Sequence, residues 1–173
     1  MKHVKGLLLI AFCAVFSQSF SQSLKGVPVK DRIFFGGSLG ASFGNYTFVN
    51  VSPIVGYRIT EKFHAGVGIT YMYYNDKYWH YEESVYGGNA FARYFLFESF
   101  YATFAGGALH GYGINEQGYP EKMTVPNLWV GAGYAQQLGG NGALYFSFMY
   151  DIIDDPNSFY QNPLIRIGFG IGL

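Results

Sequence analysis

The sequence predicts an all-β fold, an eight-stranded antiparallel up-and-down barrel that crosses a membrane. Half of its 173 residues are apolar and a fifth are aromatic, yet only 13% are charged, compared with roughly 25% in an ordinary soluble protein. The apolar residues alternate with small or polar ones and form no run of roughly 18 residues, the length that a spanning helix requires. Because successive side chains of a strand point to opposite faces, this alternation is typical of strands with one apolar face.

The closing stretch, residues 162–173, shows the alternation most clearly. Isoleucines, Phe169 and Leu173 share one face, whereas Arg166 and glycines share the other with Leu164. The stretch has about the length of a tilted transmembrane strand, roughly 9–11 residues. We therefore expect its apolar face to meet lipid and its other face to line a narrow polar interior.

Residues 1–21 are predicted to be a secretory signal peptide. Lys2 and Lys5 precede an apolar stretch, and small polar residues follow it. Such a segment is too short to span a membrane as a helix and is removed on export. Cleavage before Gln22 leaves residues 22–173 as one outer-membrane β-barrel domain, without the single cysteine and therefore without a disulfide.

Alternation and turn signals divide this domain into eight predicted strands. The strands span residues 32–43, 46–58, 63–74, 84–97, 100–112, 123–136, 143–152 and 162–173. Tight-turn signals, such as Gly44-Asn45 and the LGGNG of residues 138–142, separate several of them. From the second connection onward, short turns alternate with longer loops, the asymmetry typical of outer-membrane barrels. An even number of strands also returns both ends to one side of the membrane.

Each predicted strand has its own pattern. The first alternates apolar residues with Gly and Ser. The second alternates valines with polar residues around Pro53, where we expect an irregularity because proline cannot donate to a strand ladder. The third is the clearest of the early strands, and the fourth sets alanines against Asn89 and Arg93. The fifth is ambiguous because both of its faces are small or apolar, whereas the sixth and seventh again alternate.

The face that carries most of the glycines is predicted to line the barrel interior. An eight-stranded barrel leaves only enough room inside for side chains to fill, which accounts for the glycines. The predicted interior polar network consists of Arg58, Asn89, Arg93, Asp151 and Arg166. Because a buried charge is unfavourable unless it is paired, we expect Asp151 to contact at least one of these arginines.

The opposite, apolar face is predicted to contact lipid. Its clearest members are Val67, Ile69, Leu128, Val130, Phe146, Phe148, Ile167, Phe169 and Ile171. In hydrocarbon every backbone polar group must be paired, and a closed barrel achieves this without a free edge. Tyrosines and phenylalanines near the strand ends suit the aromatic girdles of such barrels.

The alternation, the Ser-Gln at residues 21–22 and the C-terminal RIGFGIGL resemble small outer-membrane β-barrel proteins of the Bacteroidetes type, within the porin-like, OmpA-like barrel superfamily. The resemblance covers the whole mature chain. It implies a location in the Gram-negative outer membrane, contact with outer-membrane lipid, and folding by the outer-membrane insertion machinery. That machinery reads a terminal strand that usually ends in Phe. Here the last residue is Leu173, and Phe169 is the nearest aromatic residue on the same face.

The expected function is that of an integral outer-membrane protein, a monomer with a structural or surface-binding role. A net charge of zero argues against nucleic acid as a partner, and eight strands are too few for an open pore. No cofactor is expected, because the glycines recur within strands rather than in a strand–turn–helix nucleotide site. No metal site is expected either, because the histidines are isolated. We expect no enzymatic activity.

Two alternatives stay open. A lipid A-modifying outer-membrane enzyme, a deacylase or acyltransferase, would need a His and a Ser on one face with an acid to orient the His; no serine lies near His110. A soluble secreted β-barrel carrier of an apolar ligand would instead turn the apolar face inward. Two loops each allow two interpretations. The aromatic residues 78–81 either pack at the membrane interface or contact a sugar. The oxygen-rich residues 154–157 form either a turn or a weak cation site.

Overall fold

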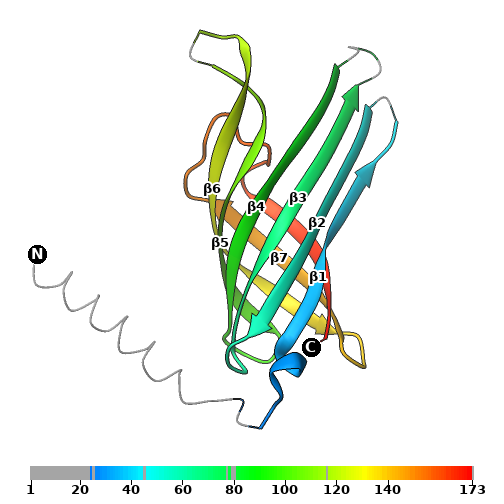
Figure 1. The fold of residues 1–173 in the computed structure, drawn as a ribbon, viewed down its shortest axis with the longest axis vertical. Helices are drawn as coiled ribbons and strands as arrows, with labels where there is room; N and C mark the ends of the chain where they lie inside the picture. The colour runs from blue at the N-terminus through cyan, green and yellow to red at the C-terminus, as the bar shows by residue number, and fades with distance from the viewer. Residues whose placement is uncertain are drawn as a thin grey trace, which may run out of the picture.

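The computed structural model describes residues 24, 26–44, 46–76, 78, 81–115 and 117–172. Its strands form one closed barrel, β1 to β8, in sequence order. Their bounds are β1 Ile33–Ser42, β2 Tyr46–Arg58, β3 Phe63–Asp76, β4 Tyr81–Phe95, β5 Phe100–Ile114, β6 Pro120–Gln137, β7 Gly142–Asp151 and β8 Leu164–Ile171. Every neighbouring pair is antiparallel. The predicted all-β, eight-stranded up-and-down barrel is therefore confirmed (Figure 1).

A short segment leads into the barrel. The predicted signal peptide, residues 1–21, lies outside the described residues. The 3₁₀ helix η2 (Val29–Arg32) directly precedes β1. Arg32 donates hydrogen bonds to the backbone carbonyls of Leu24 and Val27, which holds the lead segment together at the start of the barrel. Among the described residues, no helix is long and apolar enough to cross a membrane.

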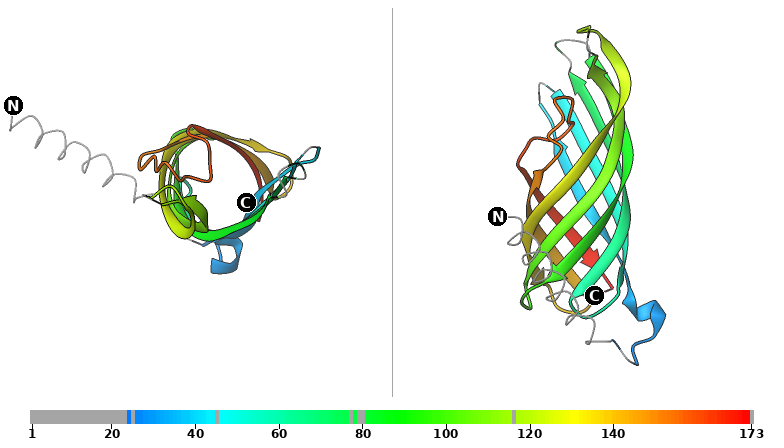
Figure 2. Two further views of the ribbon diagram at one scale, coloured as in Figure 1. Left: turned by 90° about the horizontal axis from the view of Figure 1, so that it is seen from above. Right: turned by 90° about the vertical axis from the view of Figure 1, so that its left-hand side faces the viewer.

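The two ends of the barrel differ. The base is the end where β1 starts and β8 finishes, and it carries the turns at residues 59–62, 96–99 and 138–141. The rim is the opposite end, with the β3–β4 and β5–β6 hairpins and the β7–β8 connection, residues 152–163. β3 to β6 have 14 to 18 residues, whereas β7, β8 and β1 have 8 to 10. One wall of the barrel is therefore much taller than the other (Figure 2).

The predicted alternation of short turns and long loops is wrong at two places. Residues expected in long loops after β3 and after β5 continue the strands, and pairing extends to Asp76↔Tyr81 and to Ile114↔Pro120. Tyrosine and isoleucine in these segments favour strand, which is consistent with the extension. Only the third predicted long loop, at residues 152–163, remains a long connection.

The barrel closes along a short stretch between β1 and β8. Among the described residues, the pairs there are Phe35↔Ile171, Gly36↔Gly170 and Gly37↔Phe169. The irregularity expected at Pro53 is present, because the β2–β3 pairing skips Ser52 and Pro53. Across from Pro53, Gly37 has a φ of 153°, and a Cβ there would lie 2.5 Å from the Ser52 carbonyl oxygen. Only glycine fits this contact without strain.

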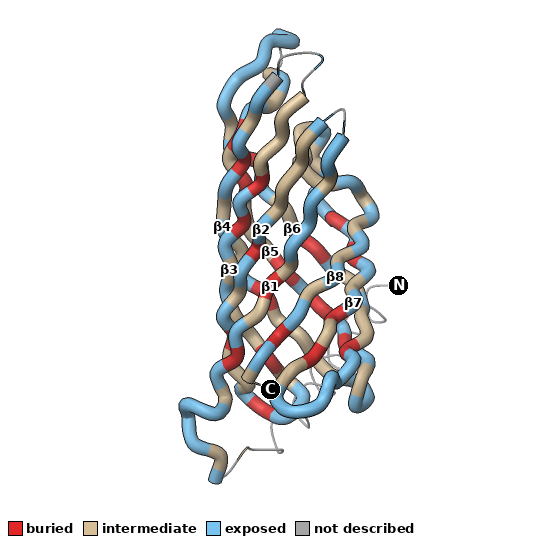
Figure 3. The backbone as a smooth tube through the Cα atoms, turned by 90° about the vertical axis from the view of Figure 1, so that its right-hand side faces the viewer, coloured by how far each residue is buried: buried red, intermediate tan, exposed pale blue. Residues whose placement is uncertain are grey.

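The register also assigns the faces of β5, which the sequence left open. Thr103 lies directly across from the inward Arg93, so Tyr101, Ala105 and Leu109 also point inward, whereas Phe104 points outward. Buried and exposed residues alternate along the strands all round the barrel (Figure 3).

Large and small side chains alternate around the interior as well as along it. One row across neighbouring strands reads Phe34, Gly56, Gly66, Phe91, Ala105, Trp129 and Asp151. The Phe34 ring lies against Gly56, and the Phe91 ring against Gly66, so closely that a Cβ on either glycine would overlap the ring. The interior glycines therefore make room for the aromatic rings beside them.

Candidate functional site

The β7–β8 connection folds into the rim end of the interior. Phe159 packs against the buried cluster of Met72, Val85 and Leu109. The Asn157 side-chain oxygen accepts a hydrogen bond from the Ile114 backbone N–H at 2.8 Å. Seen from above, the connection lies over one side of the barrel opening (Figure 2). The rim is therefore plugged by the chain itself.

Tyr160 fixes this plug to the barrel walls. Its ring meets the Trp129 ring edge-on at 5.9 Å, and its hydroxyl accepts a hydrogen bond from the Asn50 amide at 3.4 Å. The Arg166 guanidinium lies 5.4 Å from the centre of the same ring. Sequence reasoning missed this role of Tyr160. The signal was two adjacent aromatic residues, Phe159-Tyr160, in an otherwise polar loop.

Asp151 holds the ends of the same connection together. Its Oδ1 atom accepts hydrogen bonds from the backbone N–H groups of Leu128 at 2.9 Å and Ile153 at 3.1 Å. Its own backbone N–H and carbonyl bond to the Asn162 side chain at 2.9 and 3.0 Å. Within the described part of the chain its Oδ2 atom has no hydrogen-bond partner. The expected contact with an arginine is therefore wrong, because this strand-end carboxylate faces turning backbone instead.

The oxygen-rich residues 154–157 form a turn, one of the two interpretations that the sequence allowed. Asp155 accepts hydrogen bonds from the backbone N–H groups of Asn157 at 2.8 Å and Ser158 at 2.9 Å. Asp154 has a φ of 50° and accepts from the Asn162 amide at 2.7 Å. No group of three or more His, Cys, Asp or Glu side chains in the described ranges is placed to hold a metal ion.

The base half of the interior is built around Arg93. Its guanidinium carbon lies 4.4 Å from the centre of the Tyr145 ring, 4.7 Å from that of Phe91 and 5.5 Å from that of Tyr101. Cation–π contacts of this kind strengthen where water is excluded. The Tyr101 and Ser147 hydroxyls are hydrogen-bonded at 2.8 Å. This bond locks one wall of the aromatic cage in place.

Arg93 belongs to a row of basic side chains. Arg58 on β2 lies directly across from His64 on β3, which lies directly across from Arg93 on β4. His64 is 5% exposed and sits between the rings of Phe34 at 5.7 Å and Phe95 at 4.9 Å. Arg58 donates to the backbone carbonyl of Asp31. His64 was not predicted as an interior site residue, although the alternation of β3 places it on the same face as the interior glycines.

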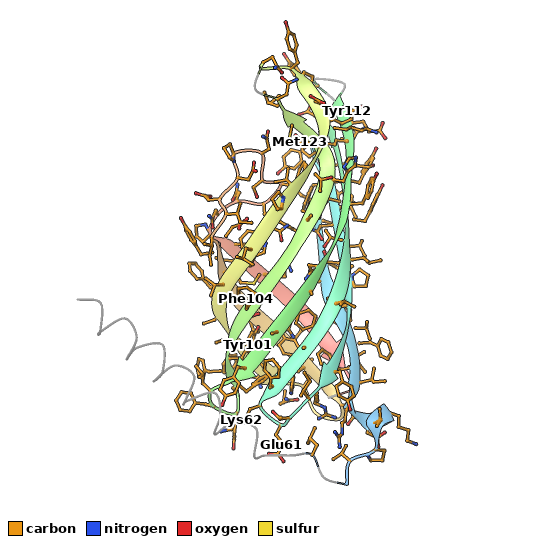
Figure 4. All side chains as sticks on the ribbon, turned by 60° about the vertical axis from the view of Figure 1, so that its left-hand side comes forward. Glu61, Lys62, Tyr101, Phe104, Tyr112 and Met123 are labelled. Atoms are coloured by element: carbon orange, nitrogen blue, oxygen red, sulfur yellow. The ribbon has the colours of Figure 1, made fainter. Side chains whose placement is uncertain are left out.

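A pocket of about 570 Å³ opens at the base below this row. We call it the base pocket. Arg58, His64 and Phe95 line it from the barrel side, together with Glu61 and Lys62 of the β2–β3 turn. Figure 4 shows that turn at the base, with Tyr101 above it.

Further up, small cavities lie between the interior side chains. A cavity of about 40 Å³ is lined by Arg93 and Arg166, and a cavity of about 20 Å³ by Asn89 and Arg166. Spaces of this size hold individual water molecules, each of which needs about 10–15 Å³ by the same measure. The structure thus brings three of the five predicted interior residues to two neighbouring cavities. Arg58 lies at the base, and Asp151 lies at the rim end of β7.

The outer surface of the barrel is apolar. Of the nine residues predicted to face lipid, Leu128 is half-buried and the other eight are exposed on the outside. Apolar side chains such as Phe35, Phe104 and Ile165 extend this surface to further strands, with exposed fractions of 64%, 49% and 74%. A carrier of an apolar ligand would need these side chains inside. The structure places them outside.

The candidate catalytic histidine of the lipid A enzyme alternative has other neighbours. His110 Nδ1 is hydrogen-bonded to the Thr124 hydroxyl at 3.0 Å, and its ring lies 5.4 Å from the Tyr86 ring. These contacts do not supply the serine and carboxylate that the alternative requires. In the aromatic stretch at residues 78–81, Trp79 and His80 lie outside the described residues.

Comparisons with known proteins found similarity to solved structures. No protein-family model matches the chain, and no curated protein sequence matches it. The N-terminal β-barrel domain of Pseudomonas aeruginosa OprF, a crystal structure, is similar over 81% of this chain and 96% of that chain. The sequence identity is 14% and the TM-score is 0.46.

Proposed function

We propose that this chain is an integral outer-membrane β-barrel protein whose role is structural or surface-binding, and that it does not form an open pore. The single observation behind the proposal is the apolar outer surface of a closed barrel. Residues such as Ile69 and Ile165, with exposed fractions of 66% and 74%, lie on this surface. Soluble monomers rarely expose apolar patches larger than a few hundred Å². Hydrocarbon is the environment that suits both this surface and a backbone without a free edge.

The filled interior supports the second half of the proposal. From the rim, the β7–β8 connection fills the opening with Phe159 and Tyr160. From the base, the aromatic cage around Arg93 fills the cross-section. The two cavities described between them are small, with room for a few waters at most.

A surface-binding role would use the tall hairpins at the rim. Tyr78, Tyr86, Tyr112 and Tyr119 are 45% to 79% exposed there. Exposed tyrosines combine an apolar ring with a polar tip and are common at recognition surfaces. A barrel of the Bacteroidetes type, folded as a monomer by the outer-membrane insertion machinery, is part of the same proposal.

Fractionation and gel mobility test the membrane location. The mature protein should be extracted only by detergent and should migrate differently before and after heating, because folded outer-membrane barrels resist unfolding by detergent at room temperature. A mature protein recovered from the periplasm without detergent would overturn the proposal. In a planar bilayer we expect no steady channel, and stable conductance would refute the closed interior.

A further inference from the structure

We propose that the base pocket binds a phosphate group carried by an apolar molecule. Arg58 and His64 are its direct partners, and Arg93 supplies a supporting positive charge. This site goes beyond the structural role, because it gives the barrel a specific ligand at the end where β1 starts and β8 finishes.

The first support is the row of three basic side chains. Arg58, His64 and Arg93 lie directly across from one another on adjacent strands. The two arginines flank the imidazole, so the row carries two fixed positive charges with no acid between them. The row continues through uncharged residues, namely Thr103, Gly131, Met149 and Leu164. It therefore lacks a carboxylate among the described residues, and an anion would neutralise it.

The second support is a set of buried polar atoms that lack partners. Arg58 Nε, both ring nitrogens of His64 and Arg93 Nη1 have no hydrogen-bond partner within the described ranges. The Glu61 backbone carbonyl faces the imidazole without reaching hydrogen-bonding geometry. His64 cannot easily turn away, because the Phe34 and Phe95 rings flank it. Arg58 and His64 line the base pocket, whereas Arg93 lines the neighbouring small cavity. Phosphate oxygens accept several hydrogen bonds at once, which matches the Arg58 Nε–H and a ring N–H of His64.

The third support is the size and lining of the base pocket. Its volume of about 570 Å³ falls in the range of pockets for small organic ligands, about 300–1,000 Å³, and greatly exceeds a phosphate group. Leu24, Phe95, Leu96 and Phe97 give it an apolar side. Lys62, Glu61 and Glu98 also line it, and all three are exposed in turns, where solvent screens them. A ligand with its phosphate group at Arg58 and His64 and its apolar tail along Phe95 would contact both the basic and the apolar residues of the pocket.

The phosphate could come from a lipid headgroup or from free phosphate, and a binding experiment separates the two. Full-length mature protein in maltoside micelles is titrated with phosphatidic acid carrying two hexanoyl chains, with inorganic phosphate and with hexanoate. We expect saturable calorimetric binding of phosphatidic acid only. Arg58→Gln and His64→Gln should each weaken this binding about tenfold or more, and Arg58→Lys should restore part of it. The control Lys122→Gln removes a positive charge at the rim, beside Tyr112, and should leave it unchanged.

Heat-dependent gel mobility shows whether each variant still folds. If folded Arg58→Gln and His64→Gln bind phosphatidic acid as tightly as the wild type, the site is refuted. Equal weakening by Lys122→Gln would also refute it, because it would indicate attraction to net charge alone. Equal binding of inorganic phosphate would support the basic row and overturn the role of the apolar lining. Equal binding of hexanoate would overturn the preference for phosphate.

Discussion

The base half and the rim half of the interior are filled by different means. At the base, the single guanidinium of Arg93 lies near three aromatic rings, and the contacts with Tyr101 and Tyr145 join side chains of different strands. At the rim, a single connection returns into the barrel and supplies Phe159 and Tyr160. The difference shows that one closed barrel can combine two kinds of core. The strands prescribe the first core, whereas a loop brings in the second.

Replacing the residue that joins the two halves should have the largest effect. Trp129 is 4% exposed, packs in the cluster with Phe34 and Phe91, and also meets Tyr160. Trp129→Ala should lower the free energy of unfolding by about 3–5 kcal/mol, because it leaves a cavity in both cores. Urea unfolding in lipid vesicles measures this loss. Tyr119→Ala at the exposed rim is the control and should change stability by less than about 0.5 kcal/mol; similar losses in the two variants would contradict a shared core.

A charge on the outer face tests what surrounds both halves. Phe148 is 57% exposed on β7. If it faces hydrocarbon, Phe148→Arg should destabilise the folded barrel by about 2–4 kcal/mol near the middle of the bilayer. The same unfolding assay measures it, with Tyr119→Arg at the rim as the matched variant in water. No destabilisation by Phe148→Arg would contradict a lipid-facing surface.

Substitutions of Asp151 test how the ends of the β7–β8 connection are held at the rim. Asp151→Ala leaves the N–H groups of Leu128 and Ile153 without their acceptor, which should lower stability by about 1–3 kcal/mol. Asp151→Asn keeps an oxygen acceptor and should lose less. Amide exchange at Leu128 and Ile153 should speed up in the alanine variant only. If exchange speeds up equally in both variants, the carboxylate charge, rather than an oxygen acceptor, holds the loop. If it speeds up in neither variant, the Asp151 side chain does not hold the loop.

The smallest effects should come from single hydroxyls, one in each half. Tyr101→Phe removes the 2.8 Å bond to Ser147 at the base, and Tyr160→Phe removes the 3.4 Å bond to Asn50 at the rim. We expect losses of about 0.5–1.5 kcal/mol, with Tyr101→Phe the larger because its bond is shorter. Thermal unfolding of the two variants side by side gives the order, and the reverse order would show that the plug is the more tightly held of the two cores.

The alternation of side chains predicted most of the fold. It placed Arg93 and Arg166 inside, because period two separates the faces whatever the partners are. It could not pair Asp151, because the donors that satisfy this carboxylate are backbone groups at a strand end and in a loop. Nor could it show that Tyr160 points inward, because the side chains of a loop do not alternate between two faces as those of a strand do. The ambiguous face of β5 became clear only from its register with β4.

Because the β1–β8 contact is short, the extent of backbone pairing between neighbouring strands differs around the barrel. Among the described residues, three pairs join these strands, whereas β5 and β6 pair continuously from Phe100↔Tyr134 to Ile114↔Pro120. Regions with few backbone hydrogen bonds open at lower free energy than the rest of a structure. We therefore expect local opening of the barrel to begin between β1 and β8, while the other strand pairs stay hydrogen-bonded.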